Sequence, residues 1–146
     1  MSTQFKHIFD PLSEQDFQKI EQEYFDNPSS RDKQLTYAYA CVHSNNEKNV
    51  DAGLAILHQL LTTAPSHHEQ LECHYLSALG KFKMERLTEA EKDLKEALSI
   101  QDHPQATQLM KAIKQKKRDN LKKQVGYVAA AALGTAAIFI AKSKAH

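Results

Sequence analysis

Residues 71–97 read LECHYLSALGKFKMERLTEAEKDLKEA, with apolar residues at helical spacing before and after residues 84–88. Counted from Leu71, small residues stand at positions 8 and 20, Ala78 and Ala90. A large apolar residue, Leu94, stands at position 24, and another small residue, Ala97, at position 27. Small residues at positions 8 and 20 let two antiparallel helices approach closely, and the large residue at 24 fills the seam between them. This stretch therefore predicts a hairpin of two helices.

A second copy of the pattern precedes this one. Counted from Gln34, the matching residues are Cys41, Gly53, Leu57, Leu60 and Pro65. Gly53 and Ala90 are 37 residues apart, close to the period of about 34 residues of tetratricopeptide repeats. The additional residues fit the connection at 62–68. The chain is therefore predicted to contain two tandem tetratricopeptide-like hairpins, with a plain helical bundle as the alternative.

Local helix signals extend this prediction to an all-α chain. Ser13-x-x-Asp16 opens a first helix, and Thr88-x-x-Glu91 is predicted to be a capping box for a fifth. Pro104 stands in the first turn of a sixth, where a missing N–H costs nothing. We predict a six-helix bundle that contains the two hairpins and is followed by a C-terminal transmembrane helix. The expected parts are an N-terminal arm and first helix (1–29), the repeats (30–104), a sixth helix with a basic stem (105–124), a membrane span (125–141) and a short basic tail (142–146).

The predicted span reads VGYVAAAALGTAAIFIA at residues 125–141, without a charge. At about 1.5 Å per residue, a helix of this length covers roughly 25 Å, just short of a hydrocarbon core of about 30 Å. The opening MSTQFKHIFDPL lacks the features of a signal peptide. We therefore expect a single-pass tail anchor with the preceding domain in the cytosol. The alternative is a buried, alanine-rich core helix.

Basic residues flank the predicted span and help to predict the membrane to which it is targeted. They are Lys122 and Lys123 on one side and Lys142 and Lys144 on the other. A short, weakly hydrophobic span suits a thin membrane with little sterol, and lysine side chains at its ends reach the headgroups. This combination favours the mitochondrial outer membrane, with the peroxisomal membrane second.

Small residues recur every four positions within the span, at Gly126, Ala130 and Gly134. Such a stripe allows two membrane helices to pack closely, which predicts a homo-oligomer. A lipid-facing stripe without any partner explains the same residues, and the sequence leaves both interpretations open.

Charge is distributed unevenly along the chain. Nine of the 19 basic residues but one of the 18 acidic residues follow residue 110, which leaves residues 1–110 with a net charge of −7. An acidic body argues against nucleic-acid binding, while the basic stem favours an anionic membrane surface. Cys41 and Cys73 are expected to be reduced, buried thiols.

The first helices of stacked hairpins form a concave face. Apolar residues are predicted to line it: Leu35, Ala38, Val42, Tyr75, Leu79 and Phe82. Because other faces of these helices already supply a core, this set predicts a groove for an amphipathic helix or an extended peptide. The alternative is that another part of this chain, such as the apolar residues between Phe5 and Leu12, fills the groove.

The sequence offers no support for an enzyme, a metal site or a cofactor. His67, His68, Cys73 and His74 are the densest group of metal-binding residue types, but on a helix they diverge too far to form a tetrahedral site. A glycine-rich phosphate loop and a nucleophile elbow are both absent from the sequence. We therefore expect a binding protein rather than a catalyst.

Three stretches resemble the mitochondrial fission 1 protein family in order and spacing. They are QLTYAYACVHS at 34–44, GLAILHQLL at 53–61 and YLSALGKF at 75–82. The basic stem, the Ala- and Gly-rich span and the Lys-Ser-Lys ending are also similar. Departures are Ala40-Cys41, where that family carries a tryptophan followed by a small or apolar residue, Phe82, where it carries a tyrosine, and residues 1–29, which show no clear match.

The resemblance implies an adaptor on the mitochondrial outer membrane, and often on peroxisomes. Such proteins help to recruit a dynamin-related GTPase, directly or through a bridging adaptor, and so promote organelle division. Two alternatives are a tail-anchored tetratricopeptide receptor for mitochondrial precursor proteins and a membrane-fusion helix protein. The second would need heptads that continue into the anchor, and residues 101–124 carry few apolar positions.

Overall fold

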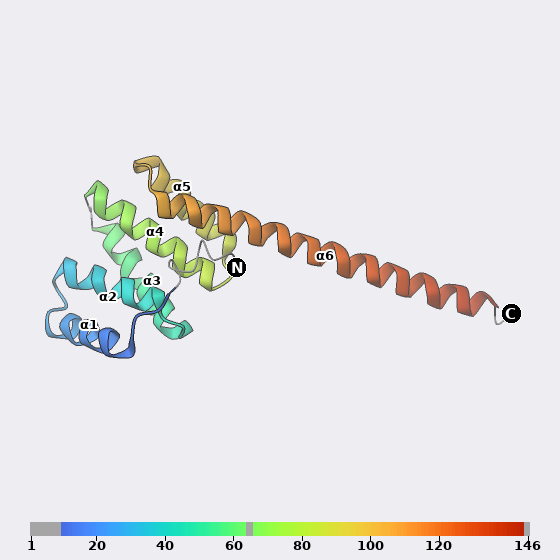
Figure 1. Cartoon of the computed structure of the whole chain (residues 1–146), viewed down its shortest axis with the longest axis horizontal. Helices are drawn as coiled ribbons and strands as arrows, with labels where there is room; N and C mark the ends of the chain where they lie inside the picture. The colour runs from blue at the N-terminus through green and yellow to red at the C-terminus, as the bar shows by residue number, and fades with distance from the viewer. Residues whose placement is uncertain (1–9, 64–65, 145–146) are drawn as a thin grey trace. The chain divides into compact units, whose positions relative to one another are not determined.

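The structure, a computed structural model, describes residues 10–63 and 66–144, with side chains as far as Leu133. The described chain contains six helices (Figure 1): α1 (Glu14–Asp26), α2 (Arg31–His43), α3 (Glu47–Thr62), α4 (His67–Lys83), α5 (Leu87–Ile100) and α6 (Pro104–Lys144). The predicted six helices and all-α class are confirmed. By compactness the chain divides into residues 1–113 and residues 114–146.

Side chains that cap helix N-termini define where most helices begin. Ser13 Oγ accepts a hydrogen bond from the Asp16 N–H at 3.1 Å, as the sequence predicts. Ser30 and Ser66 do the same at the starts of α2 and α4. Each of these serines satisfies an N–H that the helix itself leaves unpaired, so a local sequence signal sets each boundary.

The predicted capping box at Thr88 and Glu91 is wrong. Helix α5 begins one residue before Thr88, and its N-cap residue, Arg86, makes no side-chain cap bond. Glu85 adopts a left-handed conformation with φ of 61°, and the Arg86 N–H bonds back to the Lys81 carbonyl at 2.8 Å. A left-handed residue ends α4 and sets the start of α5, because it reverses the chain within one residue.

The two predicted hairpins are α2 with α3 and α4 with α5, and the two helices of each pair contact each other. A Cβ added at Gly53 would lie 2.9 Å from Cys41 Cβ and 3.1 Å from the Ala38 carbonyl oxygen, so only glycine allows this approach. Leu57 and Leu94, both at position 24, have 0% exposure. The small and large positions of the repeat therefore play the roles that the sequence predicts.

Helix α6 starts at Pro104, as predicted, and its first turns belong to the core of residues 1–113 through the buried Ala106, Leu109 and Ile113. It then runs unbroken to Lys144, whereas we predicted a separate stem helix and span. Residues 105–125 contain neither Pro nor Gly, and the single Gly126 that follows costs a helix only about 1 kcal/mol. The sequence therefore contains no residue that would end the helix between the stem (105–124) and the predicted span (125–141).

Among the residues that the structure describes, no helix carries an apolar stretch long enough to qualify as a membrane span. The predicted transmembrane helix at 125–141 is thus not found there. Its second half, from Gly134 on, and the tail residues Lys142 and Lys144 lie outside the described side chains. The side chains of Val125, Tyr127 and Val128, at its start, are 62–75% exposed.

Candidate partner-binding surface

The six predicted groove residues come together between α2 and α4, which contact each other. Five of them have exposures of only 0–5%: Ala38, Val42, Tyr75, Leu79 and Phe82. They share one buried cluster with residues of α6, and Leu35 packs against that cluster half-buried. The structure therefore corrects the expectation of an open apolar groove: these residues form a closed seam, because the same side chains complete the core. Whether a partner contacts them remains a prediction.

One border of this seam lies on α2 and is accessible at Tyr39, while Leu35 beside it is half-buried and His43 is buried, at 4% exposure. Leu35, Tyr39 and His43 are spaced four residues apart and so share one side of the helix. Tyr39 is 45% exposed, and its ring centroid lies 4.1 Å from that of His43. We call these three residues the Tyr39 edge. Tyr39 had no predicted role, although its spacing from Leu35 and His43 is visible in the sequence.

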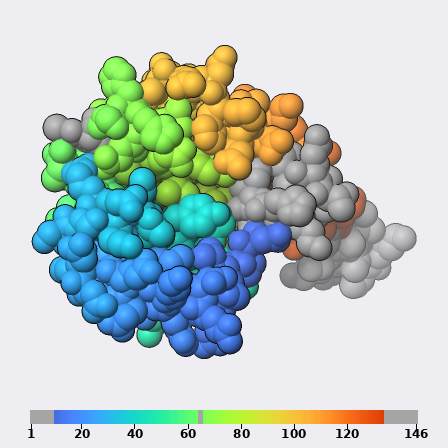
Figure 2. Space-filling model, turned by 60° about the vertical axis from the view of Figure 1, so that its left-hand side comes forward, coloured from blue at the N-terminus to red at the C-terminus, as the bar shows by residue number. Residues whose placement is uncertain are grey.

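The α4 side of the border is aromatic as well. The ring centroid of Tyr75 lies 5.0 Å from that of His103, and His103 Nε2 lies 3.7 Å from a Glu72 carboxylate oxygen. Burial, with smaller contributions from Tyr39 and Glu72, raises the pKa of Tyr75 well above its usual range. Tyr75 is therefore a neutral, packed ring, and Tyr39 is the more exposed of the two tyrosines. Figure 2 shows α2, in cyan, beside α4, in green, on one face of the molecule.

Two cations hold the hairpins against each other. Lys83 Nζ donates to the Val42 carbonyl at 3.0 Å and to the Ser44 carbonyl at 2.5 Å, so a side chain of α4 caps the end of α2. Burial lowers the pKa of Lys83. At the opposite end of α2, Arg31 donates to the Leu60 carbonyl at 3.2 Å and pairs with Glu69. These bonds fix the position of α2, and with it the Tyr39 edge.

The second hairpin contains a polar cluster around Asp93, which is 14% exposed. Its carboxylate accepts hydrogen bonds from Ser77 Oγ at 2.9 Å and Lys81 Nζ at 2.5 Å, with His74 Nδ1 at 3.4 Å. Burial alone raises the pKa of Asp93, but these three hydrogen bonds and the Lys81 charge outweigh it, so the pKa lies below its usual value. The cluster therefore joins α4 to α5, since its donors come from α4 and its carboxylate from α5.

The histidines and the cysteine at the start of α4 do not converge. His74 faces Asp93, while Cys73 is fully buried. In the described ranges of the chain, no three His, Cys, Asp or Glu side chains are placed to hold one metal ion.

Known proteins resemble this chain in sequence and in fold. The family model of the Fis1 C-terminal tetratricopeptide repeat matches residues 71–121. The mitochondrial fission 1 protein of Yarrowia lipolytica is 30% identical over 112 residues, which cover 75% of this chain and 71% of that protein.

Two crystal structures share the fold. Yeast Fis1 in complex with an Mdv1 fragment superposes with a TM-score of 0.71 at 18% identity, over 80% of this chain and 94% of that one. Fis1 from Saccharomyces cerevisiae gives a TM-score of 0.68 at 19% identity, over 81% and 95%. The fold is therefore the tetratricopeptide-like helical fold of these structures. Together with the sequence match to the Yarrowia protein, this shows that the chain belongs to the mitochondrial fission 1 protein family.

Proposed function

We propose that this chain is an adaptor on the mitochondrial outer membrane that recruits the organelle division machinery. The observation that carries the proposal is the 30% identity to a mitochondrial fission 1 protein over most of both chains. The Mdv1 fragment in the yeast Fis1 crystal supports a protein partner for this fold. We infer that the chain recruits a dynamin-related GTPase to the membrane, either directly or through such a bridging adaptor.

The proposed contact surface is the Tyr39 edge together with the seam beneath it. The partially exposed Tyr39 and Leu35 offer a first apolar contact for an amphipathic helix. Ala38, Val42, Tyr75, Leu79 and Phe82 contribute once the side chains that close the seam move apart. The mechanism needs no chemistry, because an anchored binding site confines its partner to the membrane surface and raises its effective concentration.

The membrane part of the proposal rests on the sequence of residues 122–146. Residues 125–141 would span the outer membrane, and Tyr127 near their start is a residue type enriched at membrane interfaces. Lys122, Lys123, Lys142 and Lys144 would direct the tail to mitochondria, and to peroxisomes second. A fluorescent reporter fused to residues 111–146 tests this: we expect it on mitochondria, and a reporter found mainly on the endoplasmic reticulum contradicts the proposed address.

Self-association through the span is a separate part of the proposal. Gly126 leaves open space around it, since an added Cβ there would meet no atom within 4 Å, and Ala130 lies one turn further along the helix. With Gly134, they would let two anchors pack closely. Replacing both glycines by leucine should lower cross-linking between copies in membranes, and an unchanged cross-linking yield argues for a lipid-facing stripe.

Partner recruitment is tested by Tyr39→Ala in cells whose own copy of the gene is deleted. We expect a normally targeted protein, elongated mitochondria and roughly tenfold weaker capture of division factors, since an aromatic contact residue often contributes 1–2 kcal/mol or more. Phe25→Ala removes another exposed aromatic side chain, on α1, and serves as the matched control. Normal mitochondria with Tyr39→Ala would contradict the proposed contact.

The alternative function, a receptor for mitochondrial precursor proteins, shares the anchor and the helical hairpins. It predicts binding of Arg-rich amphipathic presequences rather than division factors. A pull-down with the full chain that compares both ligand classes separates the two functions. Capture of presequences, together with undisturbed mitochondrial shape in the deletion strain, favours the receptor.

A further inference from the structure

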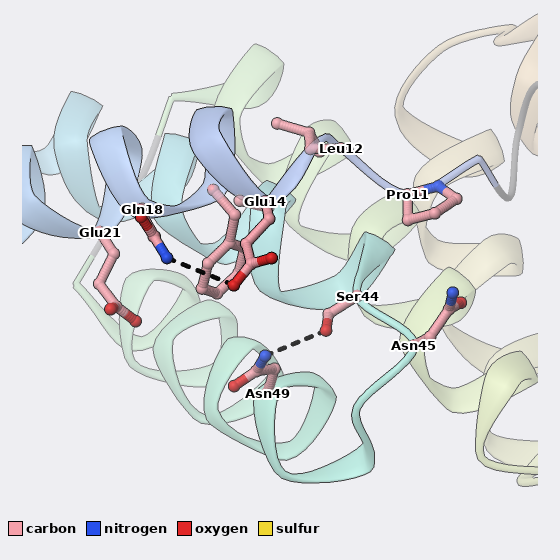
Figure 3. Close-up of a pocket in the computed structure, with 10 residues that line it drawn as sticks. Pro11, Leu12, Glu14, Gln18, Glu21, Ser44, Asn45 and Asn49 are labelled. Carbon is pink, nitrogen blue, oxygen red and sulfur yellow. Dashed lines mark hydrogen bonds between the residues drawn. The ribbon is translucent and has the colours of Figure 1, made fainter.

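A pocket of about 450 Å³ lies between α1 and the turn that joins α2 to α3. Figure 3 shows its two sides: Glu14 and Gln18 come from α1, while Ser44 and Asn49 come from the end of α2 and the start of α3. We call it the α1 pocket. It is separate from the Tyr39 edge, and nothing in the proposed function depends on it.

The pocket has an apolar floor. Ala40, at 1% exposure, closes it from the α2 side. Phe17 and Leu12 line it from the α1 side, and both are only half-buried. Part of their apolar surface therefore faces the pocket rather than the core, which favours an apolar side chain as occupant.

Among the described residues, the charged side chains that line the pocket are all negative. Glu14 and Glu21 line it, and no Lys, Arg or His from that part of the chain does. Glu21 accepts a hydrogen bond from the Tyr37 hydroxyl at 3.1 Å, and Glu14 one from Gln18 at 3.4 Å, but neither carboxylate pairs with a cation among the described residues. Glu23, on the same helix but outside the pocket, already has Lys33 at 3.0 Å. The pocket thus holds two carboxylates that can each accept a cation.

Amide side chains complete the lining. The side chains of Asn45 and Gln18 are exposed. The side-chain amide of Asn49 donates one hydrogen bond to Ser44 Oγ at 3.0 Å. Primary amides donate and accept at once, as a peptide backbone does. An extended peptide backbone is therefore the polar partner that these three side chains match.

We propose that the α1 pocket binds an extended peptide segment of another protein in which a Lys or Arg stands next to an apolar side chain. The apolar side chain lies on Phe17 and Leu12, the cation pairs with Glu14 or Glu21, and the backbone bonds to the amides. The acidic character of residues 1–110, with a net charge of −7, steers such a segment toward this part of the chain.

The test uses the full chain in uncharged detergent and a fluorescent peptide, acetyl-Leu-Arg-Leu-Lys-Leu-Arg-amide. Fluorescence anisotropy measures its affinity at low and high salt. We expect E14Q/E21Q to weaken binding about fivefold at low salt, and this difference to shrink at high salt because exposed charges are screened. L12S should weaken binding about threefold at both salt concentrations. The matched control is D26N/E96Q, which removes the same charge at exposed positions outside the pocket, and it should bind within twofold of the parent chain.

The outcomes separate the pocket from its alternatives. An equal loss in D26N/E96Q shows attraction by net charge alone and overturns the proposal. So does equal binding of a peptide in which serine replaces every leucine, because the apolar floor would then have no role. Binding that requires removal of residues 1–9 identifies the chain's own N-terminal segment as the occupant, and binding that weakens as the chain concentration rises identifies a second copy; either result overturns the proposal as well.

Discussion

The two hairpins share one pattern of small and large residues but are held together by different means. In the α2–α3 hairpin, Gly53 contacts Cys41 and the Ala38 carbonyl closely, and the ends of α2 are fixed by side chains of α4, Lys83 and Glu69. The α4–α5 hairpin contains its own polar cluster around Asp93. The first hairpin therefore depends on the second for its position, while the second is stabilised from within.

The family model of the C-terminal repeat matches residues 71–121, which contain most of the second hairpin. Of the three stretches that resemble the mitochondrial fission 1 protein family, two lie in the first hairpin and one in the second. The sequence pattern is therefore recognisable in both hairpins, although the two are held together differently.

The largest expected effect concerns the seam between the hairpins. Leu79→Glu places a carboxylate at a position with 0% exposure. The cation one helical turn further along α4, Lys83, already donates to the Val42 and Ser44 carbonyls. Burying an unpaired charge is among the few changes that cost more than about 4 kcal/mol, so we expect the chain to lose its cooperative thermal transition in circular dichroism. Tyr39→Glu makes the same chemical change at the exposed edge and should keep the transition. A folded Leu79→Glu chain would mean that the seam opens easily.

The internal cluster of the second hairpin is tested by Asp93→Asn. At pH 7 we expect a loss of about 1.5–3 kcal/mol in the free energy of unfolding, measured with urea, because hydrogen bonds to a charged carboxylate are lost. The pKa of Asp93 is lowered in the folded chain. Its contribution is therefore present above about pH 4, the ordinary value, and is lost as the pH falls through the folded pKa.

The difference between the parent chain and Asp93→Asn should accordingly be smaller at pH 3 than at pH 7, because pH 3 lies below the ordinary value of the pKa. Glu91→Gln removes the carboxylate that pairs with Lys95, a side chain that is 67% exposed, and should change stability by less than about 0.5 kcal/mol. If the Asp93→Asn loss is the same at both pH values, the carboxylate charge does not stabilise the second hairpin.

The close approach in the first hairpin is tested by Gly53→Ala. The added Cβ would press against backbone and a neighbouring Cβ, neither of which can move aside. We expect a net loss of about 1–2 kcal/mol in chemical unfolding, although alanine favours a helix. Gly80→Ala is the matched control, since its closest contact is Leu54 Cδ2, the flexible end of a side chain. Equal effects at the two glycines would remove this distinction between the hairpins.

The smallest effect is a gain at the turn of the second hairpin. Glu85 is the one non-glycine residue with a positive φ in the described parts of the chain. Glycine adopts this conformation without strain, so Glu85→Gly should raise the free energy of unfolding by about 0.5–1 kcal/mol. Asn45→Gly, in the turn of the first hairpin, should bring no gain. A loss with Glu85→Gly would mean that the Glu85 side chain contributes more than its backbone strain costs.

The sequence predicted what depends on local residues. Ser13 caps a helix through an N–H three positions away, and the repeat positions of Gly53, Leu57 and Ala90 define hairpins through pairs of neighbouring helices. The closed seam was not predictable in this way. Whether Leu79 faces solvent depends on side chains as distant as Ile113, which shares its cluster and which no spacing within α4 reveals.

The polar cluster around Asp93 could have been predicted from the sequence by looking for polar residues that share one side of a helix. Ser77 and Lys81 lie on one side of α4, and Asp93 is the acid that the next helix places opposite them. The capping box at Thr88 was predicted wrongly because the motif considers only the residues from 88 to 91. The left-handed conformation of Glu85, which sets the start of α5, lies outside that motif.

The two buried thiols can report how often each hairpin opens. Cys41 lies in the first hairpin and Cys73 in the second, and both are completely shielded from solvent. Burial raises the pKa of Cys41 to about 11 and that of Cys73 to about 12, so neither thiol reacts with an alkylating reagent while its surroundings stay closed. The rate at which each becomes alkylated therefore reports how often its own hairpin opens, and α2, held from outside, should release its thiol first.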